Sequence, residues 1–220
     1  MKLGVLGGTF DPIHNGHIAA ALASQAQLGL GAITLIPSRI PPHRRDRTGA
    51  TAEQRYEMAS LVAAEHQGWC SSRIEIDRPG PSYTFDTLTE LKQQRGEWQL
   101  FFITGADAFA EIASWSRYPA VLDLANFVVV SRTGITLNSL RERVPSAFRN
   151  HPPCSPSDLG VADSEKSRVI LVEAHTPDIS STDIRRRVRA GDSLTGLVPD
   201  SIAHYIAAHG LYSGAQMAQN

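Results

Sequence analysis

Two histidines, His14 and His17, lie three residues apart near the start of the chain, shortly after a pair of glycines. The apolar residues 3–6 before the glycines predict a buried strand, and the Ala- and Leu-rich residues 18–28 predict a helix. A strand, a glycine-rich turn and a helix start together direct backbone N–H groups at an anion. Because both imidazoles lie where the helix is expected to begin, they can face one bound phosphate. Residues 7–17 therefore predict a phosphate site that contains imidazoles.

This stretch also has ordinary explanations, since a glycine pair often makes only a turn and histidines near a helix start are often solvated. The whole string favours the phosphate site, because a structural turn has no use for Gly-Gly, Thr, Asp-Pro, two His and a third Gly together. Two common phosphate motifs are excluded. No Lys-Ser/Thr pair follows the glycines, and their spacing is not G-x-G-x-x-G.

A second informative string lies at residues 179–185, Ile-Ser-Ser-Thr-Asp-Ile-Arg. Ser180 or Ser181 can cap a helix there and, with the first amides of that helix, can meet a phosphate. Arg185 follows about one turn later. The alternative is an ordinary capped helix with a solvated basic face, formed by Arg185, Arg186, Arg187 and Arg189.

Both strings resemble signatures of the nucleotidyltransferase superfamily with the His-x-Gly-His motif. Residues 8–17 (GTFDPIHNGH) match the first signature, and residues 179–185 match its Ile-Ser-Ser/Ala-Thr-x-Ile-Arg motif. In that superfamily the second histidine stabilises the α-phosphate of a nucleoside triphosphate while another substrate's phosphate attacks it. The resemblance implies a Rossmann-like nucleotidyltransferase fold and catalytic roles for His14, His17 and Arg185.

Such a transfer needs no Ser or Cys nucleophile, because the attacking phosphate oxygen is already nucleophilic. The protein has to hold two anions in line and neutralise the charge that develops on pyrophosphate. Histidine, arginine and helix N-termini suit this task, and Mg²⁺ usually bridges the phosphates. We therefore expect Mg²⁺ as cofactor, held mainly by the substrates, with no metal ligand assigned in the chain.

Segments between the two strings resemble the bacterial nicotinate-nucleotide adenylyltransferase family, over about residues 2–212 with 145–166 excepted. They are Pro41-Pro42-His43-Arg44, Pro81-Ser82-Tyr83-Thr84, Gly105-Ala106-Asp107, Trp115-Ser116-Arg117-Tyr118 and Ser131-Arg132. The resemblance implies transfer of AMP from ATP to nicotinate mononucleotide by direct in-line attack on the α-phosphate. The products would be deamido-NAD and pyrophosphate, in NAD biosynthesis.

The same resemblance implies two sets of binding residues. ATP would contact Gly8, Thr9, Phe10, His14, His17, Gly105, Asp107, Ile179, Ser180, Ser181 and Arg185. Nicotinate mononucleotide would contact Thr9, His43, Arg44, Tyr83, Thr84, Trp115, Tyr118 and Arg132.

The nicotinate ring is expected among aromatic residues. Tyr83, Thr84 and Tyr118 would line the carboxylate pocket, mainly through backbone N–H groups, and Trp115 would stack on the pyridine ring. Without the resemblance, Trp115 is more simply a core or lid aromatic and Tyr83 a loop anchor.

Charged groups are expected at the phosphates and at a ribose. Arg132, His43 and Arg44 would face phosphates, and Asp107 would meet a ribose hydroxyl. The simpler alternatives are a solvated basic loop and an N-cap role for Asp107. The family often has Arg-Pro-Gly where this chain has Arg-Thr-Gly from position 132, which leaves the arginine in place.

Other acceptors remain open at this stage: nicotinamide mononucleotide, pantetheine phosphate, or a phosphorylated alcohol with CTP. Pantetheine-phosphate enzymes are usually shorter and lack the block at residues 115–118. A nucleotide-binding regulator without turnover is a different class, but such a protein would be expected to lose one of the motif residues, and all are present.

Strands and helices are expected to alternate along the chain. Strands are predicted at residues 32–37, around 74–76, 100–103, 127–130 and 169–172. Helices are predicted at residues 51–66, 85–94, from about 179, and 198–209. This order predicts one domain over residues 1–212, a doubly wound parallel sheet, with a disordered tail at 213–220 and a loop or small insertion at 145–166. Ligands of such sheets bind beyond the carboxyl ends of the strands, where most of these loops lie.

Composition limits the other function classes. The 220 residues are 42 % hydrophobic, and 21 basic against 22 acidic side chains leave a net charge of -1, which does not support nucleic-acid or membrane-surface binding. Two cysteines are too few for a disulfide framework, and no apolar run approaches a membrane span of about 20 residues. We expect a cytoplasmic protein with no signal peptide. The sequence leaves open whether it forms a homo-oligomer.

Overall fold

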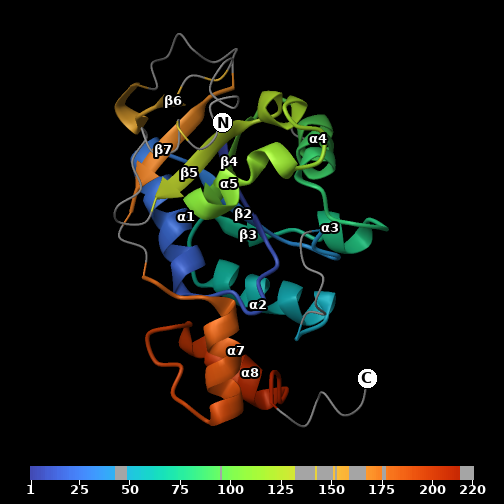
Figure 1. Cartoon of the computed structure of the whole chain (residues 1–220), viewed down its shortest axis with the longest axis vertical. Coiled ribbons are helices and arrows are strands. Elements are labelled where there is room, and N and C mark those ends of the chain that lie inside the picture. The colour runs from blue at the N-terminus through green and yellow to red at the C-terminus, as the bar shows by residue number, and fades with distance from the viewer. Residues whose placement is uncertain are drawn as a thin grey trace.

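Apolar strand segments alternate with helices along the chain, and they assemble into one parallel sheet (Figure 1). The computed structural model describes residues 1–42, 49–94, 96–131, 142, 151, 153–158, 167–174 and 177–213. In these residues the sheet has seven strands in the order β3-β2-β1-β4-β5-β7-β6, and every neighbouring pair is parallel. The doubly wound parallel sheet that the sequence predicts is confirmed.

The strands are β1 (Lys2–Gly8), β2 (Ala32–Pro37), β3 (Trp69–Ser71), β4 (Gln99–Gly105), β5 (Asn126–Ser131), β6 (Pro153–Cys154) and β7 (Val169–Glu173). The α-helices are α1 (Asn15–Leu28), α2 (Ala52–Ala64), α3 (Ile74–Asp77), α4 (Thr84–Gln94), α5 (Ala106–Ala110), α7 (Ser181–Ala190) and α8 (Asp200–Ala208). Short 3-10 helices are η1 (Ile112–Ser114), η2 (Ala120–Asp123) and η4 (Pro156–Asp158).

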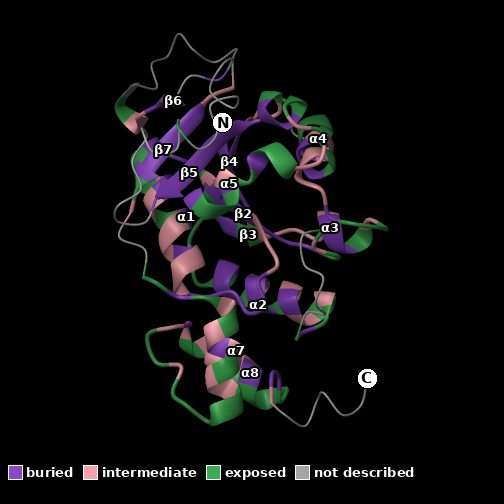
Figure 2. Ribbon diagram, viewed as in Figure 1, coloured by how far each residue is buried: buried purple, intermediate pink, exposed green. Residues whose placement is uncertain are grey.

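Side chains alternate between the two faces of the sheet along each strand, and this alternation makes two apolar cores. In β4, Phe101 and Ile103 join the core under α1, α2, α7 and α8. Leu100 and Phe102 join the opposite core, under α4 and α5. Because both faces are covered, the central strands are nearly continuous apolar runs, and they are mostly buried in Figure 2.

The prediction of a strand around residues 74–76 is wrong. Ile74 and Ile76 lie in helix α3, and the third strand is β3, paired with β2 at the edge of the sheet. An apolar residue at every second position over three residues fits one helical turn as well as a strand. Glu75, which a half-buried strand would expose, is buried between the two isoleucines.

Element ends differ from the prediction near the first motif. β1 continues through Gly7 and Gly8, so the glycine pair ends the strand instead of forming a turn after it. Helix α1 begins at Asn15, three residues earlier than predicted, and is capped after Leu28 by Gly29, whose φ of 61° is left-handed. Thr84, predicted in a loop, is the first residue of α4. Residues 145–166, predicted as a loop or insertion, contribute the short edge strand β6 and η4.

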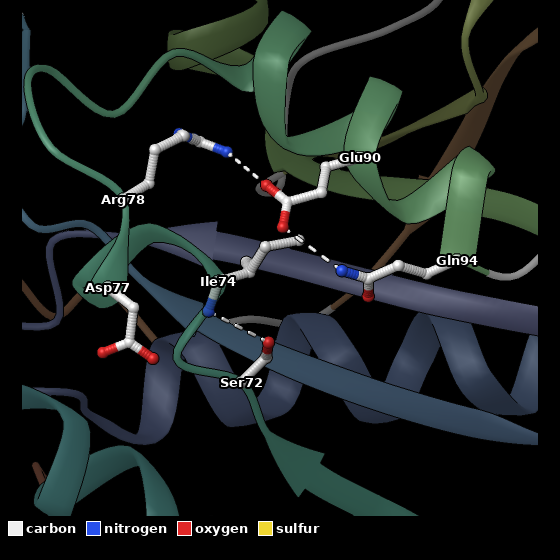
Figure 3. A pocket seen from close by; sticks show the side chains of 6 residues that line it. All are labelled: Ser72, Ile74, Asp77, Arg78, Glu90 and Gln94. Atoms are coloured by element: carbon white, nitrogen blue, oxygen red, sulfur yellow. Dashed lines mark hydrogen bonds and ion pairs between the residues drawn. The ribbon is translucent and has the colours of Figure 1, made fainter.

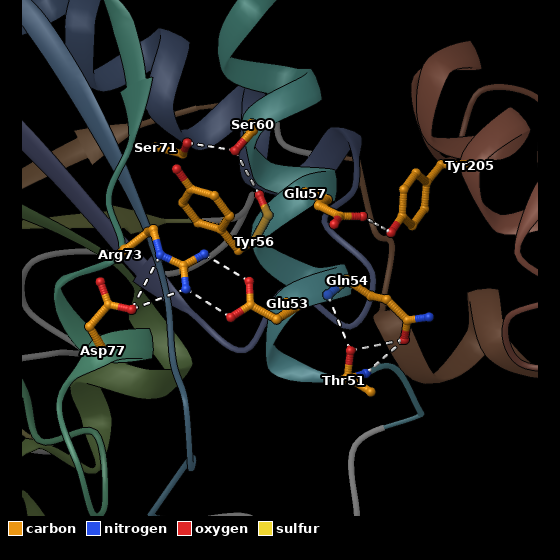
Figure 4. Close-up of polar contacts among 10 residues, drawn as sticks. All are labelled: Thr51, Glu53, Gln54, Tyr56, Glu57, Ser60, Ser71, Arg73, Asp77 and Tyr205. Atoms are coloured by element: carbon orange, nitrogen blue, oxygen red, sulfur yellow. Dashed lines mark hydrogen bonds and ion pairs between the residues drawn. The ribbon is translucent and has the colours of Figure 1, made fainter.

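Helix α2 is joined to its neighbours by polar contacts (Figure 4). Arg73, just before α3, binds Glu53 with both guanidinium nitrogens, at 2.7 and 2.8 Å, and this bonding lowers the pKa of Glu53. On the other side, the Tyr205 hydroxyl of α8 donates to Glu57. Helix α8 is thereby attached to α2. The C-terminal helices α7 and α8 lie together at one end of the molecule (Figure 1). No helix in the described ranges has the length and apolar character to cross a membrane.

Candidate active site

The carboxyl ends of four neighbouring strands meet at one edge of the sheet. Gly8 of β1 pairs with Pro37 of β2, and Gly105 of β4 pairs with Val130 of β5. Since Leu6 pairs with Ile103, Gly8 and Gly105 end adjacent strands at the same level. The two predicted ATP-binding glycines are therefore neighbours. This edge is where the ligands of a doubly wound sheet bind.

The turn after β1 is built around Phe10. This residue has a left-handed φ of 52° and is 1 % exposed, and its ring packs edge-on to His17 with centroids 5.2 Å apart. Gly8 lies directly under that ring. The Gly8 carbonyl accepts hydrogen bonds from the backbone N–H and the hydroxyl of Ser38, at 2.9 and 3.0 Å. The Phe10 side chain therefore packs inside the protein beside His17, and its contact with ATP stays a prediction.

His17 is oriented by the start of its own helix. The backbone N–H of His14 donates to His17 Nδ1 at 3.2 Å, and the two imidazoles stack with centroids 3.7 Å apart. Because Nδ1 accepts this bond, the neutral ring carries its proton on Nε2. His17 can therefore donate a hydrogen bond from Nε2. This donor lies at the N-terminus of α1, which favours an anion.

Helix α7 docks its first turn on the same loop. The Ser180 hydroxyl accepts from the backbone N–H of Asp183 at 3.1 Å, so Ser180 is the N-cap, as the sequence allowed. The Ser181 hydroxyl donates to the carbonyl of Pro12 at 3.1 Å, and Ile179 is buried. Two strings separated by about 160 residues in the chain are thus in direct contact.

Arg185 reaches the turn from the same helix. One guanidinium nitrogen donates to the backbone carbonyl of Asp11 at 2.7 Å, and the same nitrogen lies 3.6 Å from the Asp11 carboxylate. The other donates to the Thr182 hydroxyl at 3.2 Å. The three residues predicted to be catalytic, His14, His17 and Arg185, all belong to this cluster around residues 8–17.

A buried arginine holds the loops behind this cluster. Arg55 of α2 is 1 % exposed, and its guanidinium donates to the carbonyls of Thr9 (2.8 Å), Ser38 and Arg39 (3.1 Å). Its Nε also donates to the carbonyl of Ala50 at 3.4 Å. A single side chain therefore connects the turn after β1, the turn after β2 and the start of α2.

The loop before α4 is attached to the loop after β2. The backbone N–H of Ser82 donates to Ile40 O, and its hydroxyl accepts from the backbone N–H of Arg39, both at 2.9 Å. The Thr87 hydroxyl is bonded to the Tyr83 carbonyl and to Glu75. Burial raises the pKa of Glu75, while its hydrogen bond from Thr87 acts in the opposite direction. Tyr83 and Thr84, which follow Ser82 directly, are half-buried, and their role in an acceptor pocket stays a prediction.

Trp115 and Tyr118 lie over the other core. Trp115 packs edge-on to Phe102, with ring centroids 6.0 Å apart, and both predicted residues are half-buried against that core. Between them, Arg117 lies over the ring of Phe85 in α4, 5.1 Å from its centroid. This contact brings residues 115–118 towards the start of α4, where Thr84 lies. The core role that the sequence allowed for Trp115 is present, and stacking on a ligand stays a prediction.

Gly105 and Asp107 lie at the end of β4. Gly105 is the N-cap of α5, and Asp107 is exposed in the first turn of that helix. The capping role considered for Asp107 is therefore wrong. Its carboxylate is open to solvent at the ligand edge of the sheet. His43, Arg44 and Arg132, predicted to face phosphates, lie outside the described residues, as do residues 214–220 of the predicted tail.

An open pocket of about 490 Å³ lies between α3 and α4 (Figure 3). It is lined by Ser72, Ile74, Asp77, Arg78, Glu90 and Gln94, none of which is a predicted site residue. Arg78 points across it to Glu90 at 3.1 Å. The pocket therefore marks the junction of α3 and α4.

Sequence reasoning missed three residues that support the site: Asp11, Arg55 and Tyr212. Arg55 carried a usable signal, because it precedes Met58 by three residues and Val62 by seven, on the buried face of α2. Tyr212, 201 residues away from Asp11, donates to its carboxylate at 2.9 Å. No local pattern connects those two residues.

The Gly8→Ala substitution is expected to damage the site more than Gly7→Ala. A Cβ at Gly8 would lie 2.8 Å from the Phe10 ring, whereas one at Gly7 would have an ordinary contact of 3.4 Å with Phe102. Overpacking costs about 1–3 kcal/mol, and moving Phe10 displaces His17. Thermal melting and the NMR signals of the His17 imidazole measure both effects. Equal changes in the two variants would contradict the support role of Phe10.

Comparisons with known proteins show the family and the fold of this chain. The model of the family described as cytidylyltransferase-like matches residues 5–187. A protein of Saccharopolyspora erythraea named "Probable nicotinate-nucleotide adenylyltransferase" is 42 % identical over 97 % of this chain and 90 % of its own. A protein of Arthrobacter sp. with the same name is 40 % identical over 95 % of this chain and 90 % of its own. A solved Plasmodium falciparum nicotinic acid mononucleotide adenylyltransferase, complexed with NaAD, has the same fold. Its TM-score is 0.71 at 16 % identity, over 96 % of this chain and 97 % of that one.

Proposed function

Because the chain belongs to the cytidylyltransferase-like family, we propose that its cleft transfers AMP from ATP to nicotinate mononucleotide. It is a nucleotidyltransferase, and its relatives are nicotinate-nucleotide adenylyltransferases of NAD biosynthesis. The products would be deamido-NAD and pyrophosphate. The observation that carries the proposal is the convergence of His17, the N-terminus of α1 and Arg185 on one loop.

In the proposed reaction a phosphate oxygen of nicotinate mononucleotide attacks the α-phosphorus of ATP in line. The bond from that phosphorus to the pyrophosphate oxygen breaks, and the electron pair leaves with pyrophosphate. Negative charge increases on the α-phosphate oxygens and on the leaving group. The Nε2–H of His17 and the amides of α1 would stabilise the charge on the α-phosphate oxygens. Arg185 would stabilise the charge on the leaving pyrophosphate.

The binding residues of the sequence prediction divide between two sides of the cleft. The ATP side comprises Gly8, Thr9, His14, His17, Gly105, Asp107, Ile179, Ser180, Ser181 and Arg185. Phe10 acts there through His17, as its burial supports. The acceptor side comprises Thr9, Tyr83, Thr84, Trp115 and Tyr118, together with His43, Arg44 and Arg132. The bonds between residues 39–40 and Ser82 support this grouping.

Nucleotidyltransferases generally use Mg²⁺. We propose that this enzyme also uses Mg²⁺, bound mainly through the substrate phosphates. Asp11 is the carboxylate in the loop, but its oxygens already accept bonds from two backbone amides and from Tyr212, and it is 1 % exposed. It is therefore unsuited as a metal ligand. When bound, Mg²⁺ would neutralise phosphate charge. We place the reaction in the cytoplasm, in agreement with the sequence.

The test is release of pyrophosphate from ATP and Mg²⁺ with a panel of acceptors. Nicotinate mononucleotide is expected to support the highest kcat/KM, and nicotinamide mononucleotide and pantetheine phosphate much lower values. A preference for the uncharged nicotinamide would overturn the carboxylate pocket around Tyr83 and Thr84. No release with any acceptor would overturn the proposed function. A reaction without acceptor corrects for simple hydrolysis of ATP.

A further inference from the structure

The carboxylate of Asp11 joins four segments that are far apart in the sequence. Oδ1 accepts from the backbone N–H of Ala50 at 3.0 Å and from the hydroxyl of Tyr212 at 2.9 Å. Oδ2 accepts from the backbone N–H of Gly49 at 2.9 Å. Arg185 approaches the same carboxylate at 3.6 Å, and binds the Asp11 backbone carbonyl more closely, at 2.7 Å. The charge of Asp11 is thus shared among several donors.

Tyr212 lies against both Arg185 and the loop before α2. It is 4 % exposed, and a Cβ added at Gly49 would lie 2.7 Å from its ring and 3.3 Å from Cδ of Arg185. Because Gly49 has no side chain, the Tyr212 ring and the aliphatic part of the Arg185 side chain can both pack against its backbone. Burial, and then the charge of Asp11, raise the pKa of Tyr212, so its hydroxyl remains a donor at neutral pH.

We propose that Tyr212 is a positioning residue for Arg185, through Asp11. Its hydroxyl satisfies Oδ1 of Asp11, and its ring borders the arginine stem, so that the guanidinium stays on the backbone carbonyl and remains available to the triphosphate. The proposal rests on the proposed function only in giving Arg185 the triphosphate as its ligand.

Loss of the Tyr212 hydroxyl changes the charge balance around Asp11 and Arg185. Without the hydroxyl, a carboxylate that is 1 % exposed loses one of its donors. Arg185 can compensate by shortening its 3.6 Å ion pair with this carboxylate, because opposite charges attract strongly where water is excluded. A guanidinium held in that pair is less available to phosphate. Removing the hydroxyl therefore weakens triphosphate binding although the hydroxyl touches no substrate.

A matched control lies in the same C-terminal segment. The hydroxyl of Tyr205 also donates to a carboxylate, that of Glu57, and attaches α8 to α2 (Figure 4). Tyr205→Phe and Tyr212→Phe therefore each remove one tyrosine–carboxylate bond. Only the Tyr212 bond of these two has as its acceptor a carboxylate, that of Asp11, which Arg185 also contacts.

The experiment measures calorimetric binding of an ATP analogue with a methylene group between the α- and β-phosphates. Tyr212→Phe is expected to weaken binding roughly three- to tenfold, with little change in the KM for nicotinate mononucleotide. Tyr205→Phe should stay within about twofold of the wild type. In an Arg185→Ala background, Tyr212→Phe should have no further effect, because the arginine transmits it.

Unchanged affinity in Tyr212→Phe, equal weakening in Tyr205→Phe, or an undiminished effect in the Arg185→Ala background would each overturn the positioning role. Thermal melting of both phenylalanine variants separates a loss of fold from a loss of binding. If the wild-type protein binds the analogue but releases no pyrophosphate, the proposed function is wrong. The comparison of the two tyrosine variants would still test the role of Tyr212, because it measures binding alone.

Discussion

Replacing His17 with alanine is expected to lower kcat by about a hundred- to a thousandfold, with a much smaller change in the KM for ATP. The imidazole is held by the His14 backbone N–H on one side and by the Phe10 ring on another. Its Nε2–H is therefore oriented before substrate arrives. A preorganised donor of this kind contributes most where charge develops in the transition state. Steady-state pyrophosphate release measures the effect.

Two further variants sharpen this test. His17→Gln places an amide N–H near the position of Nε2 and should recover part of the rate if the role is hydrogen-bond donation. His204→Ala removes an exposed histidine of α8 and should leave both constants unchanged. A His17→Ala variant that loses mainly affinity, with kcat preserved, would show that the imidazole binds ground state and transition state equally.

Replacing Arg55 with methionine is expected to reduce the free energy of unfolding by roughly 3–5 kcal/mol. Methionine keeps much of the volume of the side chain but donates no hydrogen bonds. The carbonyls of Thr9, Ser38 and Arg39 would lose their guanidinium partner. An acceptor left without a partner costs about 1–3 kcal/mol when it is fully buried, as in the bond to Ser38, and less when it is partly buried. Urea unfolding followed by circular dichroism measures the loss. Because Thr9 follows Gly8 in the site, activity should fall in the folded fraction as well.

Arg73→Met is the matched control for Arg55. Arg73 has the more conspicuous bonding, with Glu53 and Asp77 as ionic partners and the ring of Tyr56 beside it (Figure 4). Its side chain is 39 % exposed, however, and exposed ion pairs contribute little because water and salt compete for the charges. We expect a small shift of the urea midpoint at most. A larger loss in Arg73→Met than in Arg55→Met would contradict the argument from burial.

Much of the fold could be predicted because its signals are local. A strand covered on both faces has to be apolar at nearly every position, and this is why β2, β4, β5 and β7 are visible as short apolar runs. The failure at residues 74–76 has the same cause, since over three residues a helical turn and a strand present the same pattern. At these residues the packing of α3 against its neighbours determines that the segment is helical.

The sequence by itself determined the chemistry, because phosphate binding needs particular residue types at short spacing. Residues 8–17 and 179–185 each contain their predicted phosphate donors within a short stretch of chain, so residue type and order suffice to predict them. Only the tertiary structure decided what holds those donors in place. The bonds of Arg55 to three carbonyls and of Tyr212 to Asp11 join segments that meet only after the sheet is assembled, and no local pattern specifies a partner at such a distance.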